Sequence, residues 1–486
     1  MRLLEGVRDR LIRRQYRRAA RFMETADPKE LADSDPRKVL RAFRRAAREV
    51  PAYRKLLKER GVRAEGITTL DAFRRHVPIL DKHTLFAAGP LRDLCIDGNL
   101  DGIGSVYASS GQSGTFSYGV LTRAGTDRAA VGLEFLLDTL LGVLDRRTLY
   151  INCNAMGVRV PTRTIVVAET SVRSDTVLAL VERLAPEFDR LIINGESPFL
   201  KTVVEEGLDR GVPWRDLPVS LITGGEYIAE NYRSYLASIL GIDLEDPATG
   251  LIGVNFGVSE LSISLFRESQ KTLLIRRLAH EDADFRRSLY GRETRISPSI
   301  VQYFPGQFFV ETLPGEDGRS ELIVTVLDPK AKIPMIRYNT RDVVELMAYE
   351  DLADVLRAHG REDLLPRFRL PMGIIWGRGQ ALQAAEGKRV IPEEVKEALY
   401  ADHDLAQTVT GSFHLSREAD TAALLVQLRE GRRPTDESQA KLEEQLHIYV
   451  DGELAVRMLP YREFPLGFTR DFQHKCQYVA RNEENG

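Results

Sequence analysis

The sequence predicts an α/β fold, in which helices cover the faces of β-sheets. Two observations carry this prediction. Short runs rich in β-branched residues occur at 148–151, 164–167, 190–193 and 219–222, and such runs are typical of strands. An apolar, helix-like segment at 129–144 precedes them. Helices that alternate with short apolar strands favour sheets whose faces are both buried.

The size and charge of the chain limit the classes of protein to consider. With 486 residues, it is too long for one ordinary hydrophobic core, so two or three domains are expected. Hydrophobic residues make up 43% and charged residues 29%, which is typical of a globular protein. The 68 basic and 71 acidic residues give a net charge of −3, so nothing in the charge balance favours nucleic acid as a partner.

The cysteines and the apolar runs indicate a location. The three cysteines, Cys95, Cys153 and Cys476, form no CxxC pair that could hold zinc or a redox disulfide. This favours the reducing cytoplasm over secretion. Because no uncharged apolar run of about 18 residues or signal-peptide core is found, we expect a cytoplasmic protein with no transmembrane segment.

The element pattern predicts four parts. They are a helical N-terminal region (1–100) packed on the large domain, the core of that domain (101–376), a glycine-rich hinge (377–380) and a small C-terminal α+β unit (381–486). The core contains two further strand patterns, 307–311 and 321–326. The C-terminal unit is predicted to contain a helix from Pro392, a strand at 422–428, a helix at 437–450 and a strand at 456–459.

The first predicted helix is strongly basic. Its arginines are Arg8, Arg10, Arg13, Arg14, Arg17 and Arg18. Such a helix can meet an anionic membrane or a negatively charged partner. More often such a helix is the solvated face of a peripheral helix, and the sequence favours that interpretation.

A loop rich in serine and glycine follows the strand-like Val106-Tyr107. Its residues are Ser109, Ser110, Gly111, Gln112, Ser113, Gly114 and Thr115. Such a loop can turn several backbone N–H groups toward one anion. It is not a Walker loop, because no Gly-Lys-Ser or Gly-Lys-Thr closes it. Gly102-Ile103-Gly104 lacks the third glycine of a dinucleotide fingerprint.

Three downstream segments carry residues suited to a nucleotide. They are Thr223-Gly224-Gly225-Glu226, Asn255-Phe256-Gly257-Val258-Ser259-Glu260 and Arg337-Tyr338-Asn339-Thr340-Arg341-Asp342. The second combines an aromatic ring for a base with a hydroxyl and a carboxylate that suit Mg²⁺ near phosphates. The third ends in Asp342, which can accept hydrogen bonds from ribose hydroxyls. Taken singly, Glu260 also reads as a surface or capping acid and Asp342 as a turn acid.

In this order the segments resemble the adenylate-forming superfamily of acyl-CoA synthetases, adenylation domains and luciferases, most of all its phenylacetate-CoA ligase branch. The loop at Ser109 is similar to that branch's Ser-Ser-Gly-Thr-Thr-Gly phosphate loop, and Gly224-Gly225-Glu226 to its Gly-Ala-Glu adenine segment. The other matches are Phe256-Gly257-Val258-Ser259-Glu260, Arg337, Tyr338, Thr340 and Asp342, the hinge residues Gly377, Arg378, Gly387 and Pro392, and Lys475.

The resemblance implies roles for these residues and a fold. It implies a large multi-sheet adenylate-forming domain that binds ATP and a carboxylic acid, and a small mobile C-terminal lid that rotates about the hinge. Glu260 would hold Mg²⁺, and Lys475 would act in catalysis between the carboxylate and the α-phosphate. ATP would be bound by Ser109, Ser110, Gly111, Ser113, Gly114, Thr115, Gly224, Gly225, Glu226, Asn255, Phe256, Gly257, Ser259, Asp342 and Arg378.

The implied activity is that of an AMP-forming acid-CoA ligase. A carboxylic acid, aromatic or otherwise apolar, would attack ATP to give an acyl adenylate and pyrophosphate, and the acyl group would pass to the thiol of CoA. A homodimer is also implied. One alternative is transfer to a carrier protein, an amine or the chain's own Cys476. Another is a catalytically degenerate nucleotide-binding protein.

The chain departs from the pattern of this branch at several positions. Phe116-Ser117 replaces the proline and lysine that often follow the phosphate loop, and Arg341 replaces the glycine before the ribose-binding acid. Gln380 and His474 replace the usual hinge residue and the glycine before the lysine. The first of these departures changes the side chains available to contact phosphate. Those at Gln380 and His474 concern the rotation of the C-terminal lid.

Overall fold

The computed structural model describes most of the chain. The described residues are 2–86, 89–108, 117–155, 158–224, 226–258, 262–315, 319–384, 388–418, 421–465, 472 and 477–480. Among them we find no helix that combines the length and the apolar character needed to cross a membrane.

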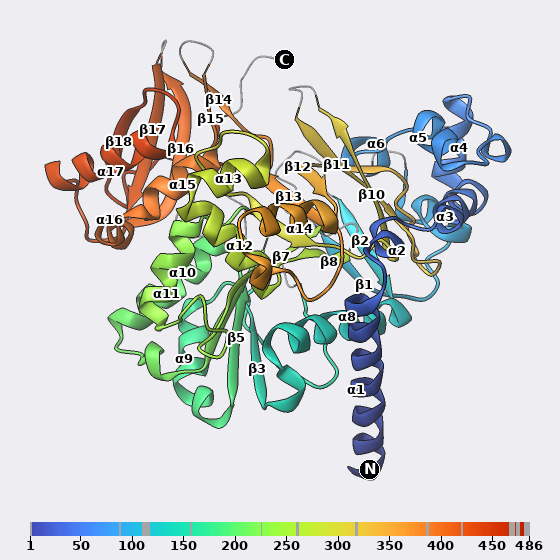
Figure 1. Ribbon diagram of the computed structural model, residues 1–486, viewed down its shortest axis with the longest axis horizontal. Helices are drawn as coiled ribbons and strands as arrows, with labels where there is room; N and C mark the ends of the chain where they lie inside the picture. The colour runs from blue at the N-terminus through green and yellow to red at the C-terminus, as the bar shows by residue number, and fades with distance from the viewer. Residues whose placement is uncertain are drawn as a thin grey trace.

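The predicted α/β class is confirmed by a mixed sheet of 11 strands in the described part of the chain (Figure 1). In spatial order the strands are β10 (Phe308–Pro314), β11 (Ser320–Val326), β12 (Tyr338–Met347), β13 (Met372–Gly377), β9 (Ser299–Gln302), β8 (Ser262–Arg267), β7 (Ile252–Val258), β6 (Val219–Thr223), β5 (Arg190–Gly195), β3 (Thr148–Asn152) and β4 (Val166–Glu169). The four strands expected in the first half of the chain are all present, although β4 begins two residues later than its pattern predicts.

At strand β7 the sheet changes from parallel to antiparallel pairing. From β4 to β7 all neighbouring strands run parallel, whereas from β7 to β10 they run antiparallel. Ligands of open α/β sheets collect beyond the carboxyl ends of the parallel strands, and β7 is the last strand of the parallel half. The end of β7 is therefore a natural position for a site.

Helices cover both faces of the parallel half, as continuous apolar strands require. Alternate residues along the strands face opposite ways: Ile151 and Ile193 contact one helix layer, and Tyr150 and Ile192 contact α8 on the other face. The helices of the large domain are α8 (Arg123–Leu141), α9 (Ser174–Leu184), α10 (Ser197–Asp209), α11 (Glu230–Leu240), α12 (Gln270–Glu281), α13 (Ala283–Tyr290) and α14 (Tyr349–Ala358).

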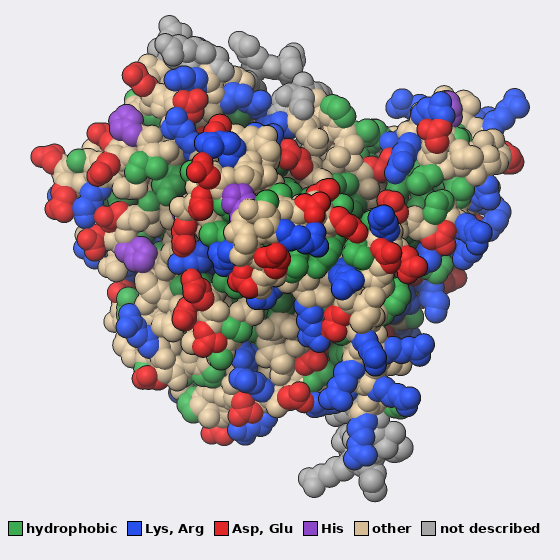
Figure 2. Space-filling model, in the orientation of Figure 1, with side chains coloured by type: hydrophobic (Ala, Val, Ile, Leu, Met, Phe, Trp, Pro, Cys, Tyr) green, Lys and Arg blue, Asp and Glu red, His purple; other side chains and the backbone are tan. Residues whose placement is uncertain are grey.

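The N-terminal region is helical, as predicted. Its helices are α1 (Arg2–Thr25), α2 (Pro28–Ala32), α3 (Pro36–Glu49), α4 (Pro51–Glu59), α5 (Leu70–His76), α6 (Lys82–Phe86) and α7 (Leu91–Leu94). Helix α1 projects from the body and carries basic side chains along its described part (Figures 1 and 2). It is held at its base, where the ring of Tyr16 meets Phe135 of α8 edge to face at 5.4 Å and Arg13 pairs with Asp145.

The C-terminal unit contains a three-stranded sheet with helices beside it. Its elements are β14 (Leu382–Gln383), β15 (Arg389–Val390), α15 (Pro392–Ala401), α16 (His403–Thr408), β16 (Val409–Glu418), β17 (Thr421–Leu428), α17 (Asp436–Tyr449) and β18 (Ala455–Leu459). Helix α15 begins at Pro392 as expected, because proline lacks only an N–H that the first helical position leaves unpaired anyway. Strands β14, β15 and β16 and helix α16 were not predicted.

The C-terminal unit shares a hydrophobic core with the large domain. Tyr232, Tyr235 and Leu236 of α11 belong to the same buried cluster as Ala398 and Leu399 of α15. Helices α11 and α15 lie against each other. The ring of Tyr400 lies 5.0 Å from that of Tyr232 and 6.3 Å from that of Tyr235, between ring centroids. The two parts of the chain are thus joined by continuous apolar packing.

Buried polar groups reinforce this junction. Ala229 provides no side-chain cap for α11, and the fully buried carboxylate of Glu397 takes that place. It accepts hydrogen bonds from the backbone N–H groups of Glu230 (2.9 Å) and Asn231 (3.0 Å) and from the hydroxyl of Tyr227 (2.9 Å). A carboxylate at a helix N-terminus satisfies unpaired N–H groups and is stabilised by the helix dipole. The C-terminal unit therefore caps a helix of the large domain.

A buried lysine makes a second polar connection. Lys201 of α10 donates to the backbone carbonyl of Val409 at 2.7 Å and to the carboxylate of Glu205 at 2.5 Å. Arg429 extends the cluster, with its Nε 3.5 Å from a carboxylate oxygen of Glu205. Desolvation lowers the pKa of Lys201 to about 8. These contacts place charged groups of both parts in one desolvated cluster.

The first turn of α15 gives a pH-dependent prediction. Burial is the main cause that raises the pKa of Glu394 from 4.5 to about 8, and its Oε2 has no hydrogen-bond partner among the described residues. Between about pH 4.5 and pH 8 the folded state keeps a proton that the unfolded state has lost, so the free energy of unfolding falls as pH rises through this window. Each unit of pKa difference is equivalent to about 1.4 kcal/mol.

Urea unfolding at pH 6 and pH 8.5 checks this prediction. The Glu394→Gln variant has no proton to lose at this position, so it is expected to lose less stability over this range than the wild type. An equal loss in both proteins would assign the pH dependence to other groups. Glu437→Gln, a substitution at an exposed carboxylate in the first turn of α17, is the matched control.

Candidate functional site

Two of the predicted nucleotide segments meet at the ends of β6 and β7. Gly224 follows β6 directly and lies beside β7. A Cβ atom at this position would lie 2.9 Å from the carbonyl oxygen of Asn255, so the close approach of the two segments requires glycine. Asn255, Phe256 and Gly257 form the half-buried second part of β7, and the ring of Phe256 lies 5.8 Å from that of Phe266.

Glu226 links this edge of the sheet to the C-terminal unit. Its Oε2 lies 2.6 Å from the ammonium nitrogen of Lys396 and accepts a hydrogen bond from the hydroxyl of Tyr478 at 2.8 Å. The ammonium of Lys396 also lies 4.3 Å from the centroid of the Tyr478 ring, which is a cation–π distance. Glu226 therefore contacts the C-terminal unit at the place where the sequence predicts an adenine segment.

Lys396 and Tyr478 were not predicted as site residues. They lie 170 and 252 residues from Glu226 along the chain. Their own surroundings in the sequence, a helix start and a segment close to the C-terminus, are typical of structural residues. The one signal that bears on them is the unusual density of acids and bases in the first turn of α15.

Asp342 and Arg378 come together at the edge between β12 and β13. Asp342 is buried, and its Oδ1 lies 3.9 Å from Nε of Arg378. Val343 pairs with Gly377 in the sheet, which sets the two side chains next to each other. The pairing of a buried carboxylate with a partly exposed guanidinium provides both an acceptor and a donor for a polar ligand.

The structure gives a reason for glycine in the family pattern at position 341. Arg341 has φ = 63°, in the left-handed region, where a residue with a side chain is strained by about 1–2 kcal/mol. Its guanidinium pairs with Asp81 at 3.2 Å and Glu321 at 3.4 Å. These ion pairs offset part of the strain, so this departure keeps the backbone conformation that a glycine would give.

The remaining predicted site residues lie outside the described residues. They are Ser109, Ser110, Gly111, Ser113, Gly114, Thr115, Gly225, Ser259, Glu260 and Lys475. The phosphate-loop segment follows β1 (Ile103–Ala108), which pairs with β2 (Tyr118–Thr122) as an antiparallel hairpin. Within the described ranges, no group of three or more His, Cys, Asp and Glu side chains could hold a metal ion.

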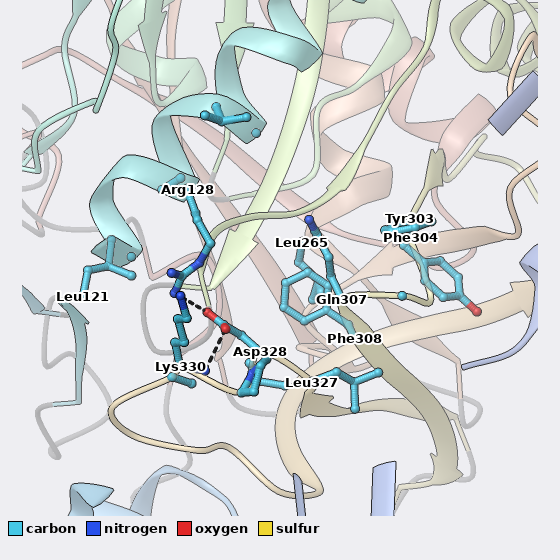
Figure 3. A pocket seen from close by; sticks show the side chains of 18 of the residues that line it. Leu121, Arg128, Leu265, Tyr303, Phe304, Gln307, Phe308, Leu327, Asp328 and Lys330 are labelled. Carbon is cyan, nitrogen blue, oxygen red and sulfur yellow. Dashed lines mark hydrogen bonds and ion pairs between the residues drawn. The ribbon is translucent and has the colours of Figure 1, made fainter. Parts of the chain in front are cut away.

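A large cavity lies beside α8, on the side of α1 and α3. Its volume is about 710 Å³, within the range typical of small-molecule sites. Residues of α1, α3, β2, α8 and β8 line it, together with 302–308 and 326–334. Figure 3 shows Arg128 of α8 reaching toward Asp328, with Leu265 and Phe308 on the wall between them and Tyr303. A smaller cavity of about 20 Å³ lies between α8 and the sheet, and both cavities are lined by Leu133 and Arg267.

Comparisons with known proteins extend this description. No protein-family model matches the chain. Over 178 residues it is 28% identical to phenylacetate-coenzyme A ligase of Pseudomonas putida. That match covers 35% of this chain and spans about a third, 34%, of the length of the curated relative.

The architecture matches solved structures over most of the chain, and its fold is that of CoA ligases. A particular solved example is 2-hydroxyisobutyryl-CoA ligase in the postadenylation state, in complex with R3-HIB-AMP. It has a TM-score of 0.66 and 15% sequence identity, with 92% of this chain and 88% of that chain covered. An open conformation of the same ligase, in complex with 2-HIB-AMP and CoA, has a TM-score of 0.53 and 14% identity, with 93% of each chain covered.

Proposed function

We propose that the chain is an AMP-forming acid-CoA ligase. It activates an apolar carboxylic acid with ATP to an acyl adenylate, releases pyrophosphate and transfers the acyl group to the thiol of CoA. The observation that carries the proposal is the fold of a CoA ligase over 92% of the chain. Within that fold, the segments that the sequence predicts to bind the nucleotide include the end of β7 and the edge between β12 and β13.

Attack of a carboxylate on the α-phosphate of ATP requires positive charge that offsets the charge of the two anions. A carboxylate is ionised at neutral pH, so no general base is needed for its attack on the α-phosphate. The barrier comes from bringing two anions together, which positioned cations and donors lower. Lys475 supplies a cation between the carboxylate and the α-phosphate. The loop from Ser109 to Thr115 donates N–H groups to the phosphates.

Other residues bind the nucleoside part. Asp342 accepts hydrogen bonds from the ribose hydroxyls, with Arg378 beside it, and the segments at Gly224 and Asn255–Gly257 hold adenine. Mg²⁺ is usually held by one or two carboxylates and by substrate phosphates, and Glu260, the residue after Ser259 in the sequence, would supply one carboxylate. When bound, the ion neutralises phosphate charge.

CoA is the proposed acceptor, and a homodimer in the cytoplasm is the proposed state. Solved structures of similar fold include a ligase in complex with both an acyl-AMP and CoA, which supports CoA over a carrier protein or an amine. Size-exclusion chromatography with light scattering tests the dimer.

An ATP–pyrophosphate exchange screen tests the proposed function. Purified full-length protein is assayed with ATP, Mg²⁺ and a panel of aromatic, fatty and amino acids. Exchange with at least one apolar acid, followed by consumption of CoA thiol, is expected. Trapping of the adenylate as a hydroxamate without CoA consumption would favour another acceptor. Absence of exchange across the panel would favour a degenerate nucleotide-binding protein.

A further inference from the structure

Arg267 stands where the two cavities meet. It is the last residue of β8 and lines both of them. It pairs with Asn255 of β7 on one side and with Gln302 of β9 on the other. Side chains of paired residues on neighbouring strands lie on the same face of a sheet. Arg267 therefore shares a face with Asn255, which belongs to the predicted nucleotide segment.

The guanidinium of Arg267 lacks a counter-ion within the described ranges. No hydrogen bond or ion pair joins it to any residue that the structure describes, and desolvation alone lowers its pKa to about 10. Three buried arginines are paired with carboxylates: Arg233 and Arg276 with Glu230 and Glu268, and Arg337 with Glu311. Arg190, which is also buried, donates to the hydroxyl of Ser220. Arg267 itself is half-buried and faces both cavities, so its guanidinium is partly desolvated without a counter-ion among the described residues, which is costly.

The walls of the large cavity are cationic as well as apolar. Six further basic residues line it: Lys38, Arg41, Arg45, Arg128, Lys330 and Lys332. Among the described lining residues, Asp328 is the single acid, and it is paired with Arg128 at 2.7 Å. Aromatic and aliphatic side chains make up much of the remainder, including Tyr16, Phe22, Met23, Phe135 and Phe308. Such walls suit an anion with a large hydrocarbon body.

The large cavity adjoins the predicted nucleotide site through the smaller cavity, which Asn255 and Arg267 both line. None of Gly224, Glu226, Phe256, Asp342 and Arg378 lines the large cavity. Its volume of about 710 Å³ corresponds to ligands of drug size, within the usual range of roughly 300–1,000 Å³. A short-chain acid would leave most of this space unfilled.

We propose that this cavity binds a carboxylic acid with a long aliphatic or multi-ring body, and that Arg267 binds its carboxylate as a bidentate counter-ion. The inference rests on the proposed function and names its substrate class. The fork of a guanidinium matches the two oxygens of a carboxylate. At this position the carboxylate lies next to the strand that carries Asn255, and the body lies among α1, α3 and α8.

Direct binding tests the proposal without turnover. Full-length protein without ATP is titrated calorimetrically with dodecanoate below its micellar concentration, with hexanoate, with phenylacetate and with dodecanol. Dodecanoate is expected to bind more tightly than hexanoate and phenylacetate. The Arg267→Met variant is expected to bind dodecanoate about 10- to 100-fold more weakly, as the loss of a charged hydrogen-bonded pair implies, with unchanged affinity for dodecanol.

Two further variants complete the design. Arg267→Lys keeps the charge without the fork, so its affinity for dodecanoate is expected to lie between those of the wild type and Arg267→Met. Arg173→Met removes an exposed arginine that pairs with Asp175 outside the cavity and is the control for loss of a guanidinium. Because Arg267 is unpaired among the described residues, Arg267→Met without ligand is expected to melt at or above the wild-type temperature.

The outcomes separate this inference from the proposed function. Binding of dodecanoate that depends on Arg267, without pyrophosphate exchange, supports the cavity assignment and contradicts the ligase. A second outcome is ATP–pyrophosphate exchange at equal rates in the wild type and Arg267→Met, with hexanoate or phenylacetate a better substrate than dodecanoate. This outcome overturns the cavity assignment and supports the ligase. Absence of dodecanoate binding to the wild type also overturns the cavity assignment.

Discussion

Replacing Lys475 by alanine is expected to lower the rate of acyl-adenylate formation by about 10²- to 10³-fold, the usual effect of removing one contact that stabilises developing charge. In the proposed reaction its ammonium lies between the attacking carboxylate and the α-phosphate oxygens. Thioester formation from a supplied acyl adenylate needs no such cation, so it should proceed at the wild-type rate. ATP–pyrophosphate exchange measures the first half-reaction, and thiol consumption with supplied adenylate measures the second.

The comparison of the two half-reactions makes the Lys475 test specific. A misfolded variant would lose both activities, whereas loss of the catalytic cation removes only one. Lys441→Ala, which changes a lysine on α17 that lies near the carboxylates of Asp402 and Asp404, is the control within the same unit and should retain both. Wild-type pyrophosphate exchange by Lys475→Ala would refute the assigned role.

The second large effect is expected from Glu397→Ala. Its buried carboxylate accepts two backbone N–H groups of α11 and the hydroxyl of Tyr227. Hydrogen bonds to a charged group contribute about 1.5–3 kcal/mol each, and donors left buried and unpaired add a further cost. We expect the free energy of unfolding to fall by about 3–5 kcal/mol, measured from the urea midpoint at constant slope.

Hydrogen exchange locates this loss of stability. The amides at the start of α11 should lose protection in Glu397→Ala, because Ala229 offers no side-chain cap of its own. Glu437→Ala removes a partly paired surface carboxylate of α17 and should change stability by less than about 0.5 kcal/mol. A similarly small change in Glu397→Ala would mean that apolar packing alone holds the C-terminal unit.

Local sequence patterns predicted the buried parallel strands of the large sheet and the two longer helices of the C-terminal unit, for clear physical reasons. Strands β3, β5 and β6 are buried on both faces, so their sequences are uninterrupted apolar runs. The start of helix α15 could be predicted from Pro392, because proline is favoured at the first position of a helix. Strand β16 was not predicted because Gly411, Ser412 and His414 interrupt its run of apolar residues. Its burial comes from packing against elements that are distant in the sequence.

Some residues of the candidate site could be predicted from the sequence, and others could not. Asp342 and Arg378 could be predicted as site residues from their segments, and the structure pairs them. Arg267 is the last residue of strand β8, and from the sequence alone it resembles an ordinary charged residue at a strand end. Strands β7 and β9 and helix α8 surround Arg267, and they place it between the two cavities without a described partner. Such properties arise only from tertiary contacts.

The shared core between α11 and α15 has a consequence for the speed of a catalytic cycle. If the C-terminal unit turns between adenylation and thioester formation, Glu397 and Lys201 must exchange buried partners for water on every turnover, and the Tyr232–Tyr400 contact must open. That exchange adds an activation barrier that chemistry at the phosphate does not set. Undocking of the two parts would then be a separate step of the cycle, located far from the reacting atoms.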